Sequence, residues 1–377
     1  MKIMSLKSDL IVNLKNLPGK KSSRKVVVIF VDDYGSIRTR SEEARQLLLK
    51  AGVPMDTSRY SRFDTLCDTE DMQMLYEVLT SVKDSRGRSA CFTPFANPAN
   101  PAFEKIWESG FTEYYREPFT ETLLRYGKDY ESVHELWKQG IAEGIFRPEY
   151  HGTEHVSVWK LMKALQKGHK STRLAFDVEC VAVPPMQGEP AVKKDTAVFD
   201  IEHAEQNTQL IEDVKVGQQL FEELLGYRSL LFTPGANLYS PAIHSALVTE
   251  GIRYISVNRY FPYPLGDGKY VKKFHWNGQK EQTGMQFIIR NCVFEPTSES
   301  GALNMNAKDI CLKNVDAALR WHNPAIISTH RVNFAGHLDK EHRNHSLDQL
   351  RSLLQEIVKR HPDVEFMSGD EMVRTIY

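Results

Sequence analysis

Short apolar runs alternate along the chain with longer amphipathic segments, and the first of these runs is the clearest. Residues 26–31 are six consecutive apolar side chains, which lead directly into Asp32 and Asp33 and are stopped by Tyr34-Gly35. A short, β-branched apolar run bounded by turn residues is typical of a strand buried on both faces. The pattern therefore predicts a buried strand that ends in two adjacent carboxylates.

Strand-like and helix-like segments continue to alternate about seven times along the chain. Further strands are predicted at 90–95, 146–150, 173–179, 229–233, 253–257, 286–294 and 325–329. Helices are predicted at 41–51, 68–83, 101–109, 129–143, 155–167, 202–225, 241–250, 308–320 and 346–360, the last with a capping box of Ser346 and Gln349. The alternation predicts an α/β fold, a parallel sheet or barrel with helices outside it.

Three segments do not follow this alternation of strands and helices. Residues 1–24 are a basic leader with apolar residues at near-helical spacing, which we interpret as a docked helix plus a linker or, alternatively, as a membrane-surface helix. Residues 183–197 are rich in proline and glycine and are interpreted as an insertion or lid within a single domain over 25–377. Residues 111–126 fit no regular pattern and are interpreted as a binding loop.

Composition narrows the classes of protein that fit. The 377 residues are 41% hydrophobic and 26% charged, with a formal net charge of -1, which gives no reason to expect a nucleic-acid partner. The five cysteines are scattered without a CxxC pair, which indicates free thiols rather than a disulfide framework or a structural zinc site. No apolar stretch is long enough to span a membrane, and no secretory signal pattern is present, so we expect a cytoplasmic protein.

Polar residues capable of chemistry follow several predicted strands. Asp32-Asp33, His151, Pro234-Gly235 and His330 each stand where a predicted strand ends. In parallel α/β folds the carboxyl ends of the strands meet at one mouth. We therefore expect these residues to share one site.

His151 and His155 are four residues apart across a predicted strand-to-helix turn, a spacing that can aim both imidazoles at one metal ion. With one carboxylate they would form a two-His-one-Asp site with open positions. The alternative is that they are two polar residues that open a helix. The sequence HGTEH is not HExxH, because its glutamate adjoins the second histidine, so it does not predict a zinc protease.

The remaining groups suggest hydrolysis. A metal lowers the pKa of a bound water toward 7, and a second aspartate beside it would act as general base. His330 is the candidate acid for the leaving group, although a histidine buried under a loop fits the same position. A backbone N–H near Pro234-Gly235 is a candidate oxyanion donor.

The motifs FVDDYG, HGTEH, LFTPGAN and IISTH, in this order, resemble those of the polysaccharide deacetylase (NodB-homology, carbohydrate esterase family four) superfamily. The resemblance spans residues 26–330 and implies a distorted (β/α) barrel. It implies that Asp32 is the base and His330 the acid. It also implies that Asp33, His151 and His155 bind one divalent ion, most commonly zinc, with cobalt or nickel as alternatives.

The sequence departs from the superfamily pattern in one way that matters for activity. The arginine expected ahead of Pro234, which orients the base, is absent, and Arg228 or Arg331 is a possible substitute. Ser328 also replaces the leucine of the last motif.

The leading hypothesis is a metal-dependent hydrolase that removes an acetyl group from an N-acetylated or O-acetylated sugar in glycan metabolism. Tyr34, Arg331 and Asn333 are candidate contacts to the sugar. One alternative is a catalytically degenerate barrel that binds a glycan or a protein without turnover. Another retains the metal but hydrolyses a different C–N or ester bond. The sequence does not indicate an oligomeric state.

Overall fold

The computed structural model describes residues 10–377, and in this part of the chain nine strands form one sheet in which all pairings are parallel. In spatial order the main path is β10 (Gln286–Ile289), β7 (Tyr254–Val257), β6 (Leu231–Phe232), β5 (Glu149–Tyr150), β2 (Phe92–Ala96), β1 (Val26–Tyr34), β12 (Ala325–His330) and β11 (Cys292–Val293). The ninth strand, β13 (Glu365–Phe366), pairs with the start of β1. The architecture is the distorted (β/α) barrel that the sequence predicts.

The first predicted strand lies at the centre of this sheet. All nine residues of β1 are buried, and β1 pairs on one side with β2 and on the other with β12, where Asp32 faces His330 in the register. Burial on both faces explains why the run contains no polar residue before Asp32. The barrel is open, since β10 and β11 end the path at opposite edges and no pairing joins them within residues 10–377. Only Arg290 and Asn291 separate these two strands in the sequence.

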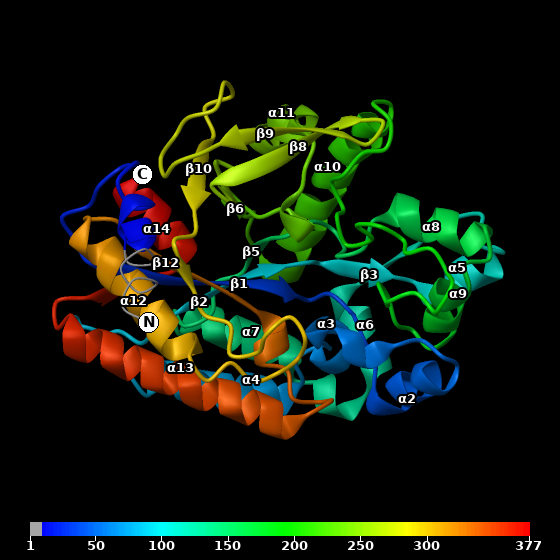
Figure 1. The fold of residues 1–377 in the computed structure, drawn as a ribbon, viewed down its shortest axis with the longest axis horizontal. Coiled ribbons are helices and arrows are strands. Elements are labelled where there is room, and N and C mark those ends of the chain that lie inside the picture. The colour runs from blue at the N-terminus through cyan, green and yellow to red at the C-terminus, as the bar shows by residue number, and fades with distance from the viewer. Residues whose placement is uncertain (1–9) are drawn as a thin grey trace.

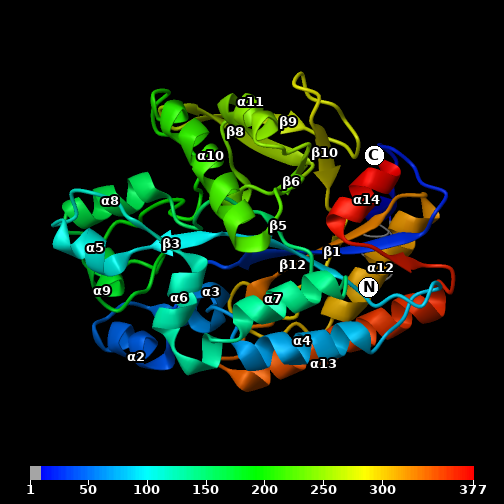
Figure 2. The same cartoon turned by 180° about the vertical axis from the view of Figure 1, so that it is seen from behind.

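Helices cover the sheet on both sides. Figure 1 shows β1 across the middle of the molecule, with α4 and α13 along one side and α11 with the β8–β9 hairpin on the other, and Figure 2 shows the same layers from behind. The helices are α2 (Glu42–Lys50), α3 (Arg59–Phe63), α4 (Thr69–Thr80), α5 (Phe103–Glu108), α6 (Phe119–Tyr126), α7 (Val133–Ala142), α8 (Val158–Gln166), α9 (Lys170–Asp177), α10 (Gln206–Leu225), α11 (His244–Thr249), α12 (Ala307–Arg320), α13 (Lys340–Arg360) and α14 (Gly369–Ile376). Two small antiparallel pairs lie outside the main sheet, β3 (Ala99–Pro101) with β4 (Arg116–Pro118) and β8 (Tyr260–Gly266) with β9 (Lys269–Phe274).

The structure corrects several predicted elements. Residues 173–179 lie largely in helix α9, whose buried Ser171 and Ala175 are four apart as a helix requires, so the predicted strand is wrong. Helix α13 begins at Lys340 with Asp339 as its N-cap, and Ser346 is a buried residue inside it rather than a cap. The predicted strand at 286–294 is two strands that pair with opposite edges of the sheet. Residues 111–126 contain β4 and α6 rather than an irregular loop.

The leader can be followed only in part, because residues 1–9 lie outside the described residues. Residues 10–14 are helical, and the chain that follows packs on the barrel. The Lys15 ammonium donates to Asn314 at 3.2 Å, and the buried Asn16 side chain accepts a 3.0 Å hydrogen bond from Asn291. No helix in residues 10–377 is long and apolar enough to cross a membrane.

Candidate active site

Four of the predicted strand ends meet at one cavity of about 220 Å³, here called the strand-end cavity. Its lining includes Asp32 and Asp33 at the end of β1, His151 and His155 after β5, Pro234 after β6, and His330 at the end of β12. Thr196, from the predicted insertion, also lines it. The carboxyl edge of the sheet thus brings together residues that are up to about 300 positions apart in the sequence.

The end of β1 is bent so that both aspartates reach this cavity. In a regular strand, adjacent side chains point to opposite faces. Here the pairing of β1 with β2 shifts register between Val31 and Tyr34, and Asp33 adopts a left-handed φ of 78°. Such a backbone conformation costs free energy for a residue with a side chain and is concentrated at functional sites. Because of this bend, the two adjacent carboxylates reach the same cavity instead of pointing to opposite faces of the strand.

Asp33, His151 and His155 form a cluster of possible metal ligands. Their ligand atoms all lie within 4.8 Å of one another. His151 Nε2 and His155 Nε2 lie 3.4 and 3.0 Å from the same Asp33 Oδ1. Burial alone would raise the pKa of Asp33, but His155 and His151 outweigh it and hold the pKa well below its usual range. The carboxylate is therefore ionised, as a metal ligand must be.

The ring of His151 is oriented for such a role. Its Nδ1 lies 2.7 Å from the carbonyl oxygen of Thr233, which can only accept a hydrogen bond. Nδ1 therefore carries a proton and donates it, which fixes the ring with Nε2 facing Asp33. A second hydrogen bond of this kind is typical of metal-binding histidines, so the residues present fit a divalent cation.

The other aspartate, Asp32, is held by an arginine that the motif analysis missed. Arg290 Nη1 and Nη2 lie 2.6 and 2.7 Å from the two carboxylate oxygens of Asp32, and Arg290 also donates to Thr233 and Ser328. Both members of the pair are buried. Burial would raise the pKa of Asp32, but the charge and hydrogen bonds of Arg290 lower it below its usual value. The carboxylate is ionised and fixed in orientation.

Neither arginine named as a possible substitute occupies this position. Arg228 is a surface residue that pairs with Glu222 at 2.8 Å, and Arg331 is fully buried against Asp64 at 2.8 Å. Arg290 follows the last residue of β10, in the gap between β10 and β11. A charged residue inside the largely apolar run 287–294 was the signal that could have identified it.

His330 is held by a carboxylate on its other side. Its Nδ1 lies 2.6 Å from Glu295 Oε1, and its Nε2 lies 3.7 Å from Asp32 Oδ2. Burial would lower the pKa of His330, but Glu295, with help from Asp33 and Asp32, raises it to about 9. Glu295 is in turn fixed by Arg59 at 2.5 Å and by Asn333 at 2.8 Å. The imidazole is therefore protonated near neutral pH, with Nε2–H directed toward the aspartates.

The loop after β6 approaches the histidines closely. At Gly235 an added Cβ would lie 2.9 Å from the carbonyl oxygen of Thr196 and 3.4 Å from His155 Nε2, so a side chain there would press on both. The next two residues, Ala236 and Asn237, have left-handed φ values and line the cavity. Glycine permits the close approach.

Three predicted sugar contacts do not reach the cavity. Tyr34 is buried among Trp137 and Phe146. Arg331 and Asn333 are fully buried and support Asp64 and Glu295 from behind the site. The sequence placed them close to functional residues along the chain, but their side chains point into the core.

Comparison with known proteins gives one family match and several distant structural neighbours. The family model described as "Glycosyl hydrolase family 57" matches residues 53–314. No curated protein sequence matches the chain. All the solved structures described next share 12% or less sequence identity with it.

A putative polysaccharide deacetylase from Mycobacterium smegmatis is 12% identical, with 95% of this chain and 91% of that chain covered and a TM-score of 0.45. A putative glycoside hydrolase/deacetylase from Parabacteroides distasonis is 8% identical, with 94% and 71% covered and a TM-score of 0.47. A 4-alpha-glucanotransferase from Thermococcus litoralis is 10% identical, with 94% of this chain but 41% of that chain covered and a TM-score of 0.43.

Proposed function

We propose that this chain, which belongs to glycosyl hydrolase family 57, is a metal-dependent hydrolase that removes an acetyl group from an N-acetylated or O-acetylated sugar. Family membership makes it a carbohydrate-active enzyme. The family that matches is glycosyl hydrolase family 57, whereas the sequence analysis named the polysaccharide deacetylase superfamily. The bond that is hydrolysed, the metal and the roles of the residues are our proposals. They rest on one observation, the cluster of Asp33, His151 and His155 placed beside a fixed base and a protonated acid.

In this proposal Asp33, His151 and His155 hold one divalent cation, and a ligand set of two imidazoles and one carboxylate favours zinc. Such an ion supplies Lewis acidity and water activation when bound. Thr233 fixes the ring of His151 with Nε2 toward the cluster, and Asp33 is ionised, as a ligand must be.

The protein groups then account for both proton transfers. Asp32, ionised and oriented by Arg290, takes a proton from the water that attacks the acetyl carbonyl carbon. His330, protonated through its contact with Glu295, gives a proton to the departing nitrogen or oxygen of the sugar. The products are acetate and the free amine or hydroxyl, and one water is consumed.

A second candidate is hydrolysis of a glycosidic bond, which family membership favours. That reaction uses two carboxyl groups on opposite sides of the scissile bond. Asp32, Asp33 and Asp64 line the strand-end cavity, and each is already bound to a cationic or imidazole partner. Burial raises the pKa of Asp64 although it pairs with Arg331, so Asp64 is the candidate acid for this reaction. We place the reaction second because the cluster of Asp33, His151 and His155 favours metal-dependent hydrolysis.

The test is a parallel assay of acetate and of new reducing ends, with mono- and oligosaccharides of N-acetylglucosamine and O-acetylated xylose as substrates and zinc or cobalt supplied. The proposal expects acetate without new reducing ends, and loss of acetate release in His330→Ala. New reducing ends without acetate would instead establish the glycosidase. If neither product forms although the protein retains metal, another C–N or ester bond is the target, and if it also binds no metal, the chain is a non-catalytic sugar-binding barrel.

A further inference from the structure

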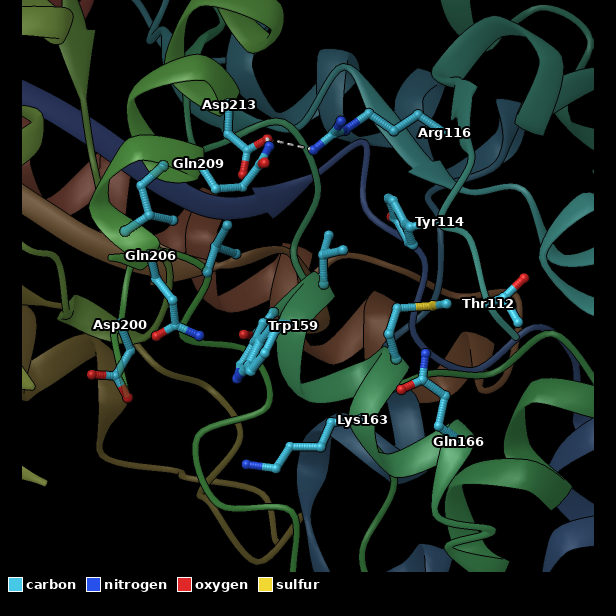
Figure 3. A pocket seen from close by; sticks show the side chains of 15 residues that line it. Thr112, Tyr114, Arg116, Trp159, Lys163, Gln166, Asp200, Gln206, Gln209 and Asp213 are labelled. Atoms are coloured by element: carbon cyan, nitrogen blue, oxygen red, sulfur yellow. Dashed lines mark hydrogen bonds and ion pairs between the residues drawn. The ribbon is translucent and has the colours of Figure 1, made fainter. Parts of the chain in front are cut away.

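A larger cavity lies beside the strand-end cavity and has no part in the chemistry described above. It has a volume of about 560 Å³, within the range of ligand-binding pockets, and is here called the Trp159 cavity. Helix α8, the first turns of α10, the segment before β4 and residues 198–200 surround it. Figure 3 shows it with Trp159 and Lys163 from α8 at its foot and with Asp213 and Arg116 at its top.

Part of its lining is apolar and centred on one tryptophan. Trp159 is 51% exposed, although it belongs to a helix whose neighbouring residues are largely buried. Its indole Nε1 donates to Glu202 at 3.2 Å, which fixes the ring through its edge and leaves a face available. Met162, Val198 and Leu210 continue the apolar surface. A ligand with an apolar face can therefore pack there.

The polar part of the lining carries no unpaired charge. Arg116 pairs with Asp213 at 2.8 Å and with Glu154 at 3.0 Å. Lys163 pairs with Glu202 at 2.7 Å, and Asp200 pairs with Lys160 at 2.8 Å. The charged side chains that line the cavity are two cations, Arg116 and Lys163, and two carboxylates, Asp200 and Asp213. The lining therefore offers no net charge for an anion or a cation and suits a neutral ligand.

Three glutamine side chains offer hydrogen bonds instead. Gln166 and Gln209 each donate through Nε2 to a protein oxygen, and Gln206 accepts two backbone N–H groups through Oε1. Within residues 10–377 the other end of each of these amides has no hydrogen-bond partner. The cavity thus presents both donors and acceptors, which matches hydroxyl groups.

The two cavities share a wall. His155 and Thr196 line the strand-end cavity, whereas Ser157 and Val198, two residues further along the same segments, line the Trp159 cavity. Two residues of chain span at most about 7 Å. The two segments are also joined, since the Ser157 N–H donates to the Asp195 carbonyl oxygen at 2.6 Å. A ligand that passes over this wall and occupies both cavities would be an oligomer rather than a single small unit.

We infer that the Trp159 cavity is a second sugar-binding site, which holds a neutral saccharide unit of an oligosaccharide whose reacting unit lies in the strand-end cavity. A pyranose ring has a face of C–H bonds to pack on the Trp159 indole and a rim of hydroxyl groups to bond with the glutamines. This inference deepens the proposed function, on which it rests for the ligand being a carbohydrate. It names the substrate as an oligosaccharide rather than a monosaccharide.

The test measures binding apart from activity. Tetrasaccharides of N-acetylglucosamine and of glucose are titrated by calorimetry into the full chain carrying Asp32→Asn, which is expected to slow turnover strongly, alone and combined with Trp159→Ala. Trp107→Ala is the matched control, because Trp107 is 62% exposed on α5 and lines no part of either cavity. We expect Trp159→Ala to weaken binding of at least one tetrasaccharide about tenfold, the size of one lost aromatic contact, and Trp107→Ala to leave it unchanged.

Binding unaffected by Trp159→Ala, or equally reduced by Trp107→Ala, would overturn the inference, as would failure of both tetrasaccharides to bind. Because Trp159 is half-exposed, its alanine variant is expected to fold, and thermal unfolding verifies this. The outcome is separable from the proposed function. Trp159-dependent binding without acetate release from any substrate would refute the deacetylase and leave the second sugar site standing.

Discussion

The strand-end cavity and the Trp159 cavity share a wall but are built in opposite ways. The first encloses about 220 Å³, and its aspartates and histidines are held by partners from distant strands. The second encloses about 560 Å³, its charges cancel, and an exposed indole and free amide ends dominate its surface. The difference teaches that a bond-breaking step requires a few charges fixed in place, whereas recognition of a sugar requires area and matched hydrogen bonds.

The largest expected effect separates rate from binding. Asp32→Asn removes the proposed base but keeps its shape, so kcat for acetate release is expected to fall about 1000-fold, while bound metal and tetrasaccharide affinity stay the same. Steady-state kinetics, elemental analysis and calorimetry on the same preparation measure the three quantities. Asp363→Asn, on an exposed aspartate, is the control. A loss of less than tenfold would exclude Asp32 as the base.

The next effect concerns how the charges are fixed. Arg290→Met leaves Asp32 buried without its partner, so we expect the free energy of unfolding to fall by about 3–5 kcal/mol and kcat to fall with it. Arg228→Met removes an arginine that pairs only at the surface and is expected to cost about 1 kcal/mol or less. Urea unfolding of both variants measures the contrast. Equal losses would mean that Arg290 has no special role in the site.

A smaller effect is a shift in pH dependence. Glu295→Gln removes the charge that raises the pKa of His330 to about 9, so the basic limb of the kcat/KM profile is expected to move down by about 1–2 pH units. An unshifted limb would show that His330 is not the group that must be protonated.

The contact between Glu295 and His330 also predicts that the free energy of unfolding of the metal-free protein depends on pH. Because the pKa of His330 is higher when folded than its unfolded value of 6.5, its contribution is fully present below about pH 6.5 and is lost as the pH rises through about 9. The stability advantage of the native protein over Glu295→Gln should therefore shrink across this window. Urea unfolding at pH 6, 7.5 and 9.5 measures it, and a constant difference would contradict the pairing.

The smallest effect belongs to the Trp159 cavity. Trp159→Ala is expected to raise KM for an acetylated tetrasaccharide up to about tenfold and to leave kcat/KM for the monosaccharide unchanged. Comparison of the two substrates in one assay gives the result. A loss of rate on both substrates would place Trp159 in the chemistry rather than in recognition.

The sequence predicted the parts of this structure that depend on local patterns. The apolar run before Asp32 could be recognised as a buried strand because every one of its residues is covered. The strand-end rule then grouped Asp32, Asp33, His151 and His330 without knowledge of their contacts. The strand predicted at 173–179 failed because a short apolar run is also compatible with one face of a helix.

The parts that the sequence did not predict depend on contacts between distant segments. Arg290 meets Asp32 only because the barrel is open between β10 and β11, and the pattern there suggested one continuous strand. Glu295 follows β11 and lies beside His330, a contact that also depends on how the chain crosses from β10 to β11. Tyr34 looked like a site residue because it follows the aspartates, yet the bend at Asp33 directs it into the core.

The most direct test of the account is the amount of divalent metal bound per chain. Elemental analysis after incubation with zinc and removal of the excess is expected to find about one equivalent in the native protein and in Asp32→Asn, and almost none in Asp33→Ala or His151→Ala. That result would show that residues from β1 and from the loop after β5 hold one ion. A native protein that binds no zinc or cobalt, or an Asp33→Ala variant that retains a full equivalent, would contradict the proposed metal centre.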